Sequence, residues 1–397
     1  MRGWRLGVVV AVAATAGGAV ALIVGDSTGW IGSSRPVLSP PPSSSDGLRQ
    51  IVVAKPVLSR SFRPAKIYAQ RSPGVVTISS EFAGPENTGI ATELGSGFVV
   101  SLGGAVLTAA HVITQQGQSG VEPAEAVFVT FPDGDRLKAK IVGWDLIDDV
   151  GVLTIDPDAH DLRPIPIGDS RRLTVGEPVA AIGSPLGGPD ALTVGVISAL
   201  QRVIPSLITS SDLLNTIQID APIAHGNSGG PILNAKGEAI GIAAQTQIGP
   251  NGGFDGVGYA VPIHVAQHSL NQLLSTGHVL YAWAGVSAED LTPAIAKRFG
   301  YAARHGALVD GIALGGPAAS AGIQPGHKNV AFLDQQITVG GDAVVAVDGI
   351  PVTDANDLAR IVAEDLRPGE YAHFAIVRGR QRLSLRVQLG SRSYEQR

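Results

Sequence analysis

The chain of 397 residues contains no cysteine. Disulfide bonds, cysteine-ligated zinc and thiol catalysis are therefore excluded, and an exported protein with this sequence must be stabilised by core packing alone. Charged residues are also few, at 16%, and 34 acidic residues outnumber 29 basic ones. A net charge of -5 gives no sign of the basic face that nucleic-acid binding needs, so we expect no nucleic acid partner.

Aromatic residues make up only 5% of the chain, whereas glycine and proline number 51 and 26. This balance favours turns and short strands over long helices. Apolar residues, at 44%, are numerous enough to build a core and argue against intrinsic disorder. We expect two domains, because single hydrophobic cores usually stop growing well below this chain length.

The N-terminus combines positive charge with a long uncharged run. Arg2 and Arg5 precede an apolar stretch at 6–24, which Asp26 closes. Residues 1–30 are predicted to be a signal peptide or a transmembrane anchor, with a buried core helix as a further alternative. No small-x-small cleavage site ends the run, which favours the anchor. We expect a single-pass protein of the cell membrane with its domains on the extracytoplasmic side, or a secreted protein if the segment is cleaved.

A stretch rich in serine and proline at 31–65 is predicted to be a semi-extended linker. After it, short β-branched segments alternate with turn residues, a pattern typical of an all-β barrel or sandwich. These predicted strands lie at 74–79, 97–100, 105–108, 127–131, 138–142, 151–155, 179–182, 216–219, 231–233 and 239–243. A helical pattern at 262–274 closes the first domain, which we place at 66–277.

A smaller α+β domain is predicted at 279–392. Its expected strands lie at 306–309, 343–347, 373–377 and 383–389, and its expected helix lies at 354–363.

Ser228 is the candidate nucleophile, in the segment Gly-Asn-Ser-Gly-Gly-Pro at 226–231. The surrounding glycines can adopt backbone angles that side chains forbid, which would let the amides of Gly226 and Ser228 turn inward as an oxyanion hole. The alternative is an ordinary hairpin turn, which asparagine and glycine often form.

His111 is the candidate base, because it follows a β run and two small residues that leave room beside its imidazole. Asp149 is the candidate orienting acid, directly before an apolar strand, with Asp145 and Asp148 as competitors. A structural histidine and a turn aspartate are the alternatives. The chain order His, Asp, Ser is that of chymotrypsin-like proteases, and it agrees with the all-β pattern.

With these motifs, residues 67–389 resemble the HtrA (Deg) family of trypsin-like serine proteases with PDZ domains. The similar motifs are Gly-Ser-Gly-Phe-Val-Val at 95–100, Leu-Thr-Ala-Ala-His-Val at 107–112, Asp-Val-Gly-Val-Leu at 149–153, and Gln-Ile-Asp-Ala at 218–221 ahead of the 226–231 segment. Further family landmarks lie at 181–187 and 258–262. The resemblance implies a chymotrypsin-like double β-barrel followed by an α+β PDZ domain. It also implies a triad of His111, Asp149 and Ser228.

Two features near the nucleophile bear on specificity. Ala224 and His225 stand where the family usually has Asn-Pro, and a proline there would restrict the loop, so His225 is either a mobile, titratable feature or an exposed spectator. Pro222 stands six positions before Ser228, where enzymes that cut after basic residues hold an acid. We therefore predict an apolar pocket of modest size, whose walls are Ala221, Pro222, Ile223, Gly241, Ile242 and Ala243.

The second domain resembles a PDZ domain of the same family. The segment Trp283, Ala284, Gly285 and Val286 is similar to the carboxylate-binding loop and the strand that pairs with a peptide. The run at 316–326 matches the following helix and turn. Residues 327–340 form an insertion relative to the family pattern, which we expect to be a longer surface loop.

The resemblance implies a serine endopeptidase that cleaves unfolded or damaged exported proteins, with peptide C-termini recognised by the PDZ domain. The alternative is a non-catalytic, chaperone-like scaffold, against which the complete set of His111, Asp149 and Ser228 argues. We expect no metal and no cofactor, since the nine histidines show no HExxH spacing. A homotrimer is implied by the resemblance alone, with Phe62 or Tyr68 as contributors.

Overall fold

The computed structural model describes residues 62–392, apart from 85–88, 118–119, 185–189, 210–211, 249–253 and 334. The predicted N-terminal segment at 1–30 lies outside these residues, as does the linker up to residue 61. No helix within the described ranges is long and apolar enough to cross a membrane.

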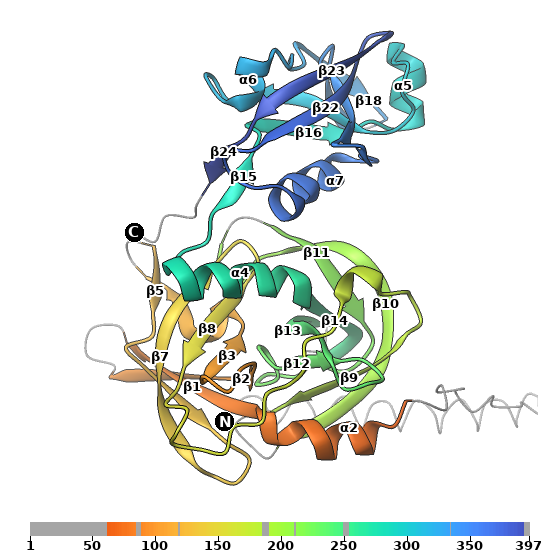
Figure 1. The fold of residues 1–397 in the computed structure, drawn as a ribbon. Helices are drawn as coiled ribbons and strands as arrows, with labels where there is room; N and C mark the ends of the chain where they lie inside the picture. The colour runs from red at the N-terminus through yellow and green to blue at the C-terminus, as the bar shows by residue number, and fades with distance from the viewer. Residues whose placement is uncertain are drawn as a thin grey trace, which may run out of the picture. The chain divides into compact units, whose positions relative to one another are not determined.

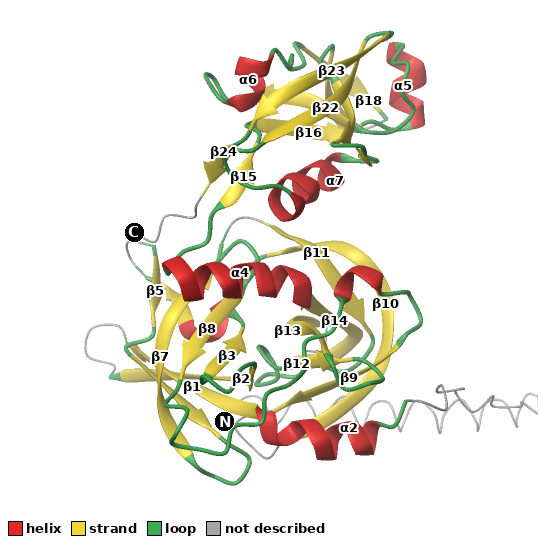
Figure 2. Cartoon of the chain, viewed as in Figure 1, coloured by secondary structure: helices red, strands yellow, loops and turns green. Residues whose placement is uncertain are grey.

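Two closed β-barrels dominate the first domain (Figures 1 and 2). The first closes in the strand order β1-β2-β3-β8-β7-β6, with every neighbouring pair antiparallel. Its strands are β1 (Val75–Ala83), β2 (Ile90–Val99), β3 (Ala105–Thr108), β6 (Ala126–Thr130), β7 (Arg136–Asp145) and β8 (Val150–Thr154). The second closes in the order β10-β11-β14-β13-β12-β9. Its strands are β9 (Pro178–Gly183), β10 (Ala191–Pro205), β11 (Asp212–Ile219), β12 (Pro231–Leu233), β13 (Ala239–Ile248) and β14 (Phe254–Pro262).

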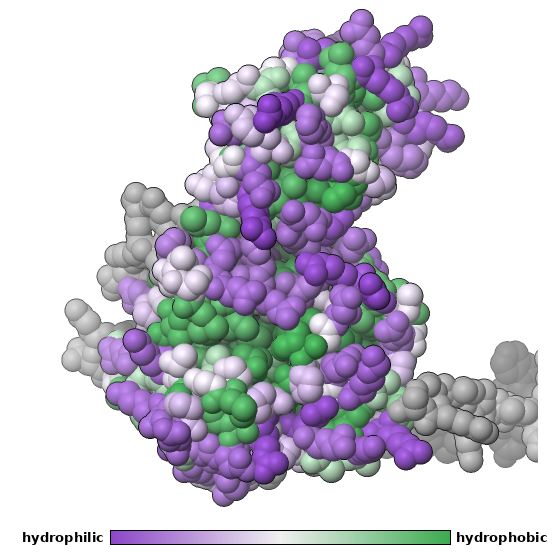
Figure 3. Space-filling view, in the orientation of Figure 1, coloured by the Kyte–Doolittle hydropathy of each residue, from purple (hydrophilic) through white to green (hydrophobic). Residues whose placement is uncertain are grey.

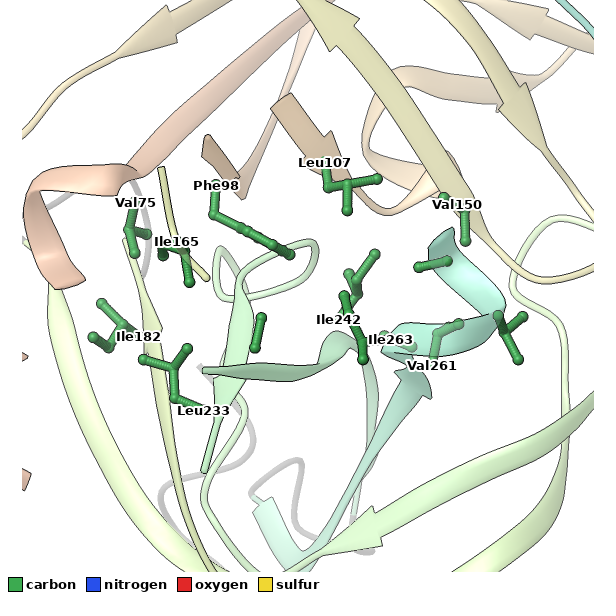
Figure 4. Packing of buried hydrophobic residues seen from close by; sticks show 14 of the residues in the cluster. Val75, Phe98, Leu107, Val150, Ile165, Ile182, Leu233, Ile242, Val261 and Ile263 are labelled. Atoms are coloured by element: carbon green, nitrogen blue, oxygen red, sulfur yellow. The ribbon is translucent and has the colours of Figure 1, made fainter. Parts of the chain in front are cut away.

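Alternating apolar residues fill the barrels, because successive side chains of a strand point to opposite faces. In β1, for example, Val76, Ile78 and Phe82 are all buried within the first barrel. A shared core lies between the two barrels, where side chains from both barrels, labelled in Figure 4, converge. Full burial of one such side chain contributes about 1.5–3 kcal/mol, so this core holds the two barrels together.

Short elements complete the first domain. They are α2 (Pro64–Arg71), a 3-10 turn η1 (Ser72–Gly74), α3 (Ala110–Ile113), a hairpin of β4 (Thr114–Gln116) and β5 (Val121–Pro123), η2 (Ser170–Arg172) and α4 (Ile263–Thr276). Helix α4 matches the helix predicted at 262–274 and ends at Gly277, whose φ of 79° suits a left-handed cap. Helix α2 was not predicted, and it begins inside the expected linker because Pro64 occupies its first turn.

The C-terminal domain is an α+β unit. Its main sheet has the order β16-β17-β20-β22-β23, with β21 paired to β20, and a second pair joins β15 to β24. The strands are β15 (Tyr281–Trp283), β16 (Val286–Asp290), β17 (Ala307–Ile312), β20 (Ala343–Val347), β21 (Ile350–Pro351), β22 (Tyr371–Arg378), β23 (Gln381–Gln388) and β24 (Gly390–Arg392). The helices are α5 (Pro293–Phe299), α6 (Pro317–Ala321), and α7 (Ala355–Arg360), which continues as a π-helical turn, η4 (Ile361–Asp365).

The insertion at 327–340, for which a longer surface loop was expected, is a β-hairpin. Strands β18 (Lys328–Phe332) and β19 (Gln335–Val339) pair antiparallel. Phe332 packs edge-on against Phe299 of α5, with ring centroids 5.8 Å apart. Alternating contacts of this kind bury one face of the hairpin and fix it to the domain.

The predicted fold class, mainly β with a double barrel followed by an α+β domain, is confirmed. Two long strands, β10 and β14, were missed. Phe62 is 5% exposed within the core of its own chain, so it does not offer the trimer contact considered above. Figure 3 shows polar side chains over most of the visible face, with apolar ones gathered over the middle of the barrel region.

Candidate active site

His111 and Asp149 are brought together by the pairing of β3 with β8. Thr108 lies opposite Gly151 in that ladder, so the residues just beyond the end of β3 meet those just before the start of β8. The His111 Nδ1 atom lies 2.7 Å from Asp149 Oδ2, and the His111 backbone amide donates to Asp149 Oδ1 at 2.9 Å. Two contacts to one carboxylate therefore fix the imidazole. Asp149 itself has a φ of 54°, a left-handed conformation that aspartate tolerates better than most residues.

The contact with Asp149 determines how the imidazole is protonated. A carboxylate can only accept, so the neutral ring carries its proton on Nδ1 and presents the Nε2 lone pair. Burial by itself would lower the pKa of His111, but the charge of Asp149, its hydrogen bond and the charge of Glu93 raise the pKa above the ordinary 6.5. His111 is thus a stronger base than a free histidine.

Asp145 and Asp148, the competing candidates, bond to other groups. Asp145 is 3% exposed and accepts hydrogen bonds from Ser269 and from the hydroxyl of Tyr281. The same hydroxyl lies 2.6 Å from Asp148 Oδ2. Neither carboxylate contacts His111 among the described residues, so the geometry selects Asp149.

The loop that carries Ser228 is pinned against the first barrel. Ser96 of β2 donates through its hydroxyl to the Gly226 carbonyl at 2.5 Å, and through its amide to the Ser228 carbonyl at 2.8 Å. Gly229 has a φ of 85°, and a Cβ there would lie 2.2 Å from the Ser96 carbonyl oxygen and 2.3 Å from Thr108 Oγ1. Only glycine fits at position 229, because of its backbone angle and because the neighbouring atoms leave no room for a Cβ.

Two backbone donors lie free beside the serine. The amides of Gly226 and Ser228 donate no hydrogen bond within the described part of the chain, whereas the Gly229 amide donates to the Ala243 carbonyl at 2.7 Å. Gly226 has a φ of 95°. Unpaired amides at a glycine-rich turn form the kind of site that binds a developing oxyanion.

The hydroxyl of Ser228 does not bond to His111 in this conformation. It donates to the carbonyl of Ala244 at 3.1 Å, and no Ser228–His111 hydrogen bond is present among the described residues. A rotation about χ1 of Ser228 is therefore needed before His111 Nε2 can accept its proton.

A cavity of about 240 Å³ opens beside Ser228. It is lined by Glu93, Leu94, His111, Val112, Leu207, Ile223, Ala224, His225, Gly226, Ser228, Ala244, Gln245 and Thr246. Leu94 and Leu207 are 41% and 60% exposed, which is high for leucine and leaves apolar surface for a substrate.

Of the predicted pocket walls, only Ile223 lines this cavity. Ala221, Ile242 and Ala243 are at most 1% exposed and belong to the hydrophobic cores, Gly241 is buried, and Pro222 is exposed but does not line the cavity. The β13 wall is instead made by Ala244, Gln245 and Thr246, after an irregularity between Ala243 and Gln245. His225 is exposed on the rim, and its imidazole forms no hydrogen bond with the described residues.

The predicted peptide-binding segment lies at an open sheet edge. Val286 begins β16, which pairs with β17 on one side and with no other described strand. Gly285 has a φ of 72°, and the carbonyls of Ala284 and Gly285 accept from Ala318 and Ala313, both at 2.9 Å. Trp283 ends β15. An edge strand with unpaired backbone groups can accept a further strand.

Comparison with known proteins agrees with this architecture. Residues 95–242 match the model of the trypsin-like peptidase domain, and residues 284–389 match that of the PDZ domain. A probable periplasmic serine endoprotease, DegP-like, from Pseudomonas fulva is 36% identical over 301 residues, which cover 76% of this chain and 56% of the relative.

Solved structures are similar over most of the described chain. The HtrA-type protease AlgW with tripeptide has a TM-score of 0.67 and 29% identity, covering 83% of this chain and 97% of that one. AlgW with decapeptide has a TM-score of 0.64 and 27% identity, covering 83% and 99%. The chain is a member of the HtrA family. This HtrA chain spans 56–57% of the length of two curated DegP-like relatives that it matches.

The HtrA assignment agrees with the motifs from which it was predicted. Within the described residues, no group of three or more histidine, aspartate or glutamate side chains is arranged to hold a metal ion.

Proposed function

We propose that this HtrA chain is a serine endopeptidase in which Ser228 is the nucleophile, His111 the general base and Asp149 the residue that orients His111. The observation that carries the proposal is the hydrogen-bonded His111–Asp149 pair at a cavity that Ser228 also lines, where the amides of Gly226 and Ser228 donate to no described residue. The serine endoprotease names of the relatives and of the solved neighbours support it.

The proposed reaction begins when Ser228 rotates away from the Ala244 carbonyl. His111 Nε2 then accepts the hydroxyl proton as Oγ attacks the scissile carbonyl. The amides of Gly226 and Ser228 stabilise the oxyanion, and the imidazolium gives its proton to the leaving amine. Water attacks the resulting acyl-enzyme by the same route, with His111 again as the base.

We propose that the residue before the scissile bond enters the cavity between Ile223 and Ala244–Thr246. No carboxylate lies on this wall, so small or medium aliphatic side chains fit better than lysine or arginine. The exposed Leu94 and Leu207 suit extended, apolar segments, which unfolded proteins present and folded ones bury. Cleavage mainly after lysine or arginine in a peptide library would contradict this assignment.

The C-terminal domain is proposed to bind the C-terminal residues of peptides at Trp283, Ala284, Gly285 and Val286, by adding a strand to the edge of β16. Solved AlgW structures carry a tripeptide or a decapeptide, which supports a peptide ligand. Titration with a labelled peptide ending in an apolar residue tests it, with the same peptide amidated at its C-terminus as the control.

The relatives are named periplasmic, which supports an extracytoplasmic location for the protease. A membrane anchor at 1–30 and a homotrimer are further proposals from the sequence. Fractionation of the full chain with and without residues 1–30 tests the first, and light scattering of the purified protein tests the second.

A non-catalytic, chaperone-like scaffold is the alternative, and the hydrogen bond from Ser228 to Ala244 is the observation in its favour. Casein hydrolysis by wild type and by Ser228→Ala separates the two functions. No release of peptides by either protein would support the scaffold and refute the peptidase.

A further inference from the structure

Among the described residues that line the active-site cavity, Glu93 alone has a full charge at neutral pH, apart from the titratable His111 and His225. The other lining residues are apolar, small or amide and hydroxyl side chains. No lysine or arginine lies among them, so the lining that the structure describes carries one negative charge and no permanent positive charge to balance it.

The backbone of β2 aims Glu93 at the catalytic residues. A Cβ placed on Gly95 would lie 2.5 Å from Val112 Cγ1 and 3.2 Å from the Ser228 carbonyl oxygen, so this face of β2 looks onto α3 and the nucleophile loop. Side chains two positions apart on a strand share a face. Glu93 therefore lies on the face of β2 that looks at His111, and its charge is one of those that raise the pKa of His111.

The barrel that supplies each wall of the cavity indicates on which side of the scissile bond Glu93 meets the substrate. Ile223 and Ala244–Thr246, from the second barrel, form the proposed pocket for the residue before the bond. His111 delivers a proton to the leaving amine, so the leaving group lies next to the imidazole. Glu93 comes from the first barrel with His111, which places its carboxylate beside the leaving-group half of the substrate.

We propose that Glu93 is a specificity-determining residue, favouring lysine or arginine and disfavouring aspartate or glutamate within two residues after the scissile bond. This inference rests on the proposed endopeptidase activity and adds its charge preference. Glu93 is exposed, so water and salt screen it. The expected preference is about two- to fivefold at low ionic strength, in the range of exposed ion pairs.

The test uses the full chain and internally quenched peptides that share one apolar residue before the cleaved bond. Lysine, glutamine or glutamate stands one or two positions after that bond, and kcat/KM is measured for each peptide. Glu93→Gln removes the charge and keeps the shape. Glu125→Gln, at an exposed position of the same barrel that does not line the cavity, is the matched control.

Wild type and Glu125→Gln are expected to prefer lysine over glutamate, and Glu93→Gln to treat the peptides alike. The preference of wild type should shrink as salt is added. Loss of the Glu93 charge should also move the acid limb of kcat/KM to lower pH, because less negative charge then acts on His111.

Equal kcat/KM for the lysine and glutamate peptides with active wild type would overturn the inference and leave the peptidase standing. An undiminished preference in Glu93→Gln would overturn it too. Cleavage by wild type no faster than by Ser228→Ala would refute the proposed activity, and this inference with it.

Discussion

The hydroxyl of Ser228 donates to the backbone carbonyl of Ala244 at 3.1 Å, and not to the imidazole of His111. A substrate strand laid along β13 needs backbone acceptors of the kind that this carbonyl provides. We predict that the serine hydroxyl and a substrate N–H compete for this oxygen, so that binding of substrate releases the hydroxyl toward His111.

A complex with a peptide boronate tests this rearrangement. We predict that Ser228 Oγ leaves Ala244 and bonds to boron, with one boronate oxygen about 2.7–3.1 Å from the amides of Gly226 and Ser228. A crystal structure measures both. An adduct in which either amide points away from the boronate would contradict the assigned oxyanion hole.

We expect His111 to set the acid limb of the pH profile. Its raised pKa means that protonation, which abolishes the base, begins to lower kcat/KM already at a pH above 6.5. Asp149→Asn removes the charge and the acceptor that hold the imidazole, and is expected to lower kcat by about 10⁴-fold.

Initial rates of cleavage of one peptide between pH 5 and 9 give both the acid limb of wild type and the activity of Asp149→Asn. An acid limb centred well below pH 6.5 would argue against the His111–Asp149 pair, as would near-normal activity of Asp149→Asn.

Gly229→Ala should destabilise the protein and abolish catalysis. A left-handed alanine alone costs about 1–2 kcal/mol. In addition, the new Cβ would clash with the Ser96 carbonyl oxygen at 2.2 Å. Gly134→Ala is a matched control, since its φ is 92° and nothing lies within 4 Å of the added Cβ.

Urea unfolding and peptide hydrolysis compare the two variants. In the Gly134→Ala control, the free energy of unfolding is expected to fall only by the cost of the left-handed backbone, and activity is expected to stay unchanged. Equal losses of stability in both variants would show that the nucleophile loop can relax around a side chain.

Asp148→Asn should stabilise the protein at neutral pH. Burial of the Asp148 carboxyl, followed by the charge of Asp145, raises its pKa well above 3.8, so the folded state binds a proton that the unfolded state has lost. That stability is present below the unfolded pKa and declines as pH rises through the folded pKa. Asparagine can donate its amide to the Tyr281 oxygen, as the protonated carboxyl does, and carries no such cost, which predicts a gain in the free energy of unfolding at pH 7.

Thermal unfolding from pH 4 to pH 8 measures the effect. The difference between the variant and wild type should widen toward high pH, whereas Asp135→Asn, at an exposed position, should run parallel to wild type. A stability gap that is constant with pH would contradict the assigned proton.

Strand prediction succeeded where apolar runs were dense. β3 and β12 lie at 105–108 and 231–233, as expected, since every residue in them is buried. β10 was missed because most of its 15 residues are only partly buried or exposed, so no apolar alternation marks it. β14 was missed because two of its nine residues are glycine, which usually marks a turn.

The sequence likewise indicated some parts of the candidate site and not others. His111, Asp149 and Ser228 were singled out because each sits at the end of a recognisable strand or turn, and the structure brings His111 and Asp149 into contact. The pocket was not, because its walls combine Leu94, Leu207 and Thr246 from three strands or loops whose meeting depends on barrel closure. The irregularity in β13 further shifts which of its residues face the cavity.

The most direct test of the central claim is the rate of casein cleavage by wild type and by Ser228→Ala, prepared identically. Ser228→Ala is expected to fold normally, because the Oγ atom makes one hydrogen bond, and to lose peptide release to the level of a blank. Mass spectrometry after a fluorophosphonate probe should find the label on Ser228 in wild type alone. Casein hydrolysis that survives in Ser228→Ala would show that another residue performs the reaction, and the account would be wrong.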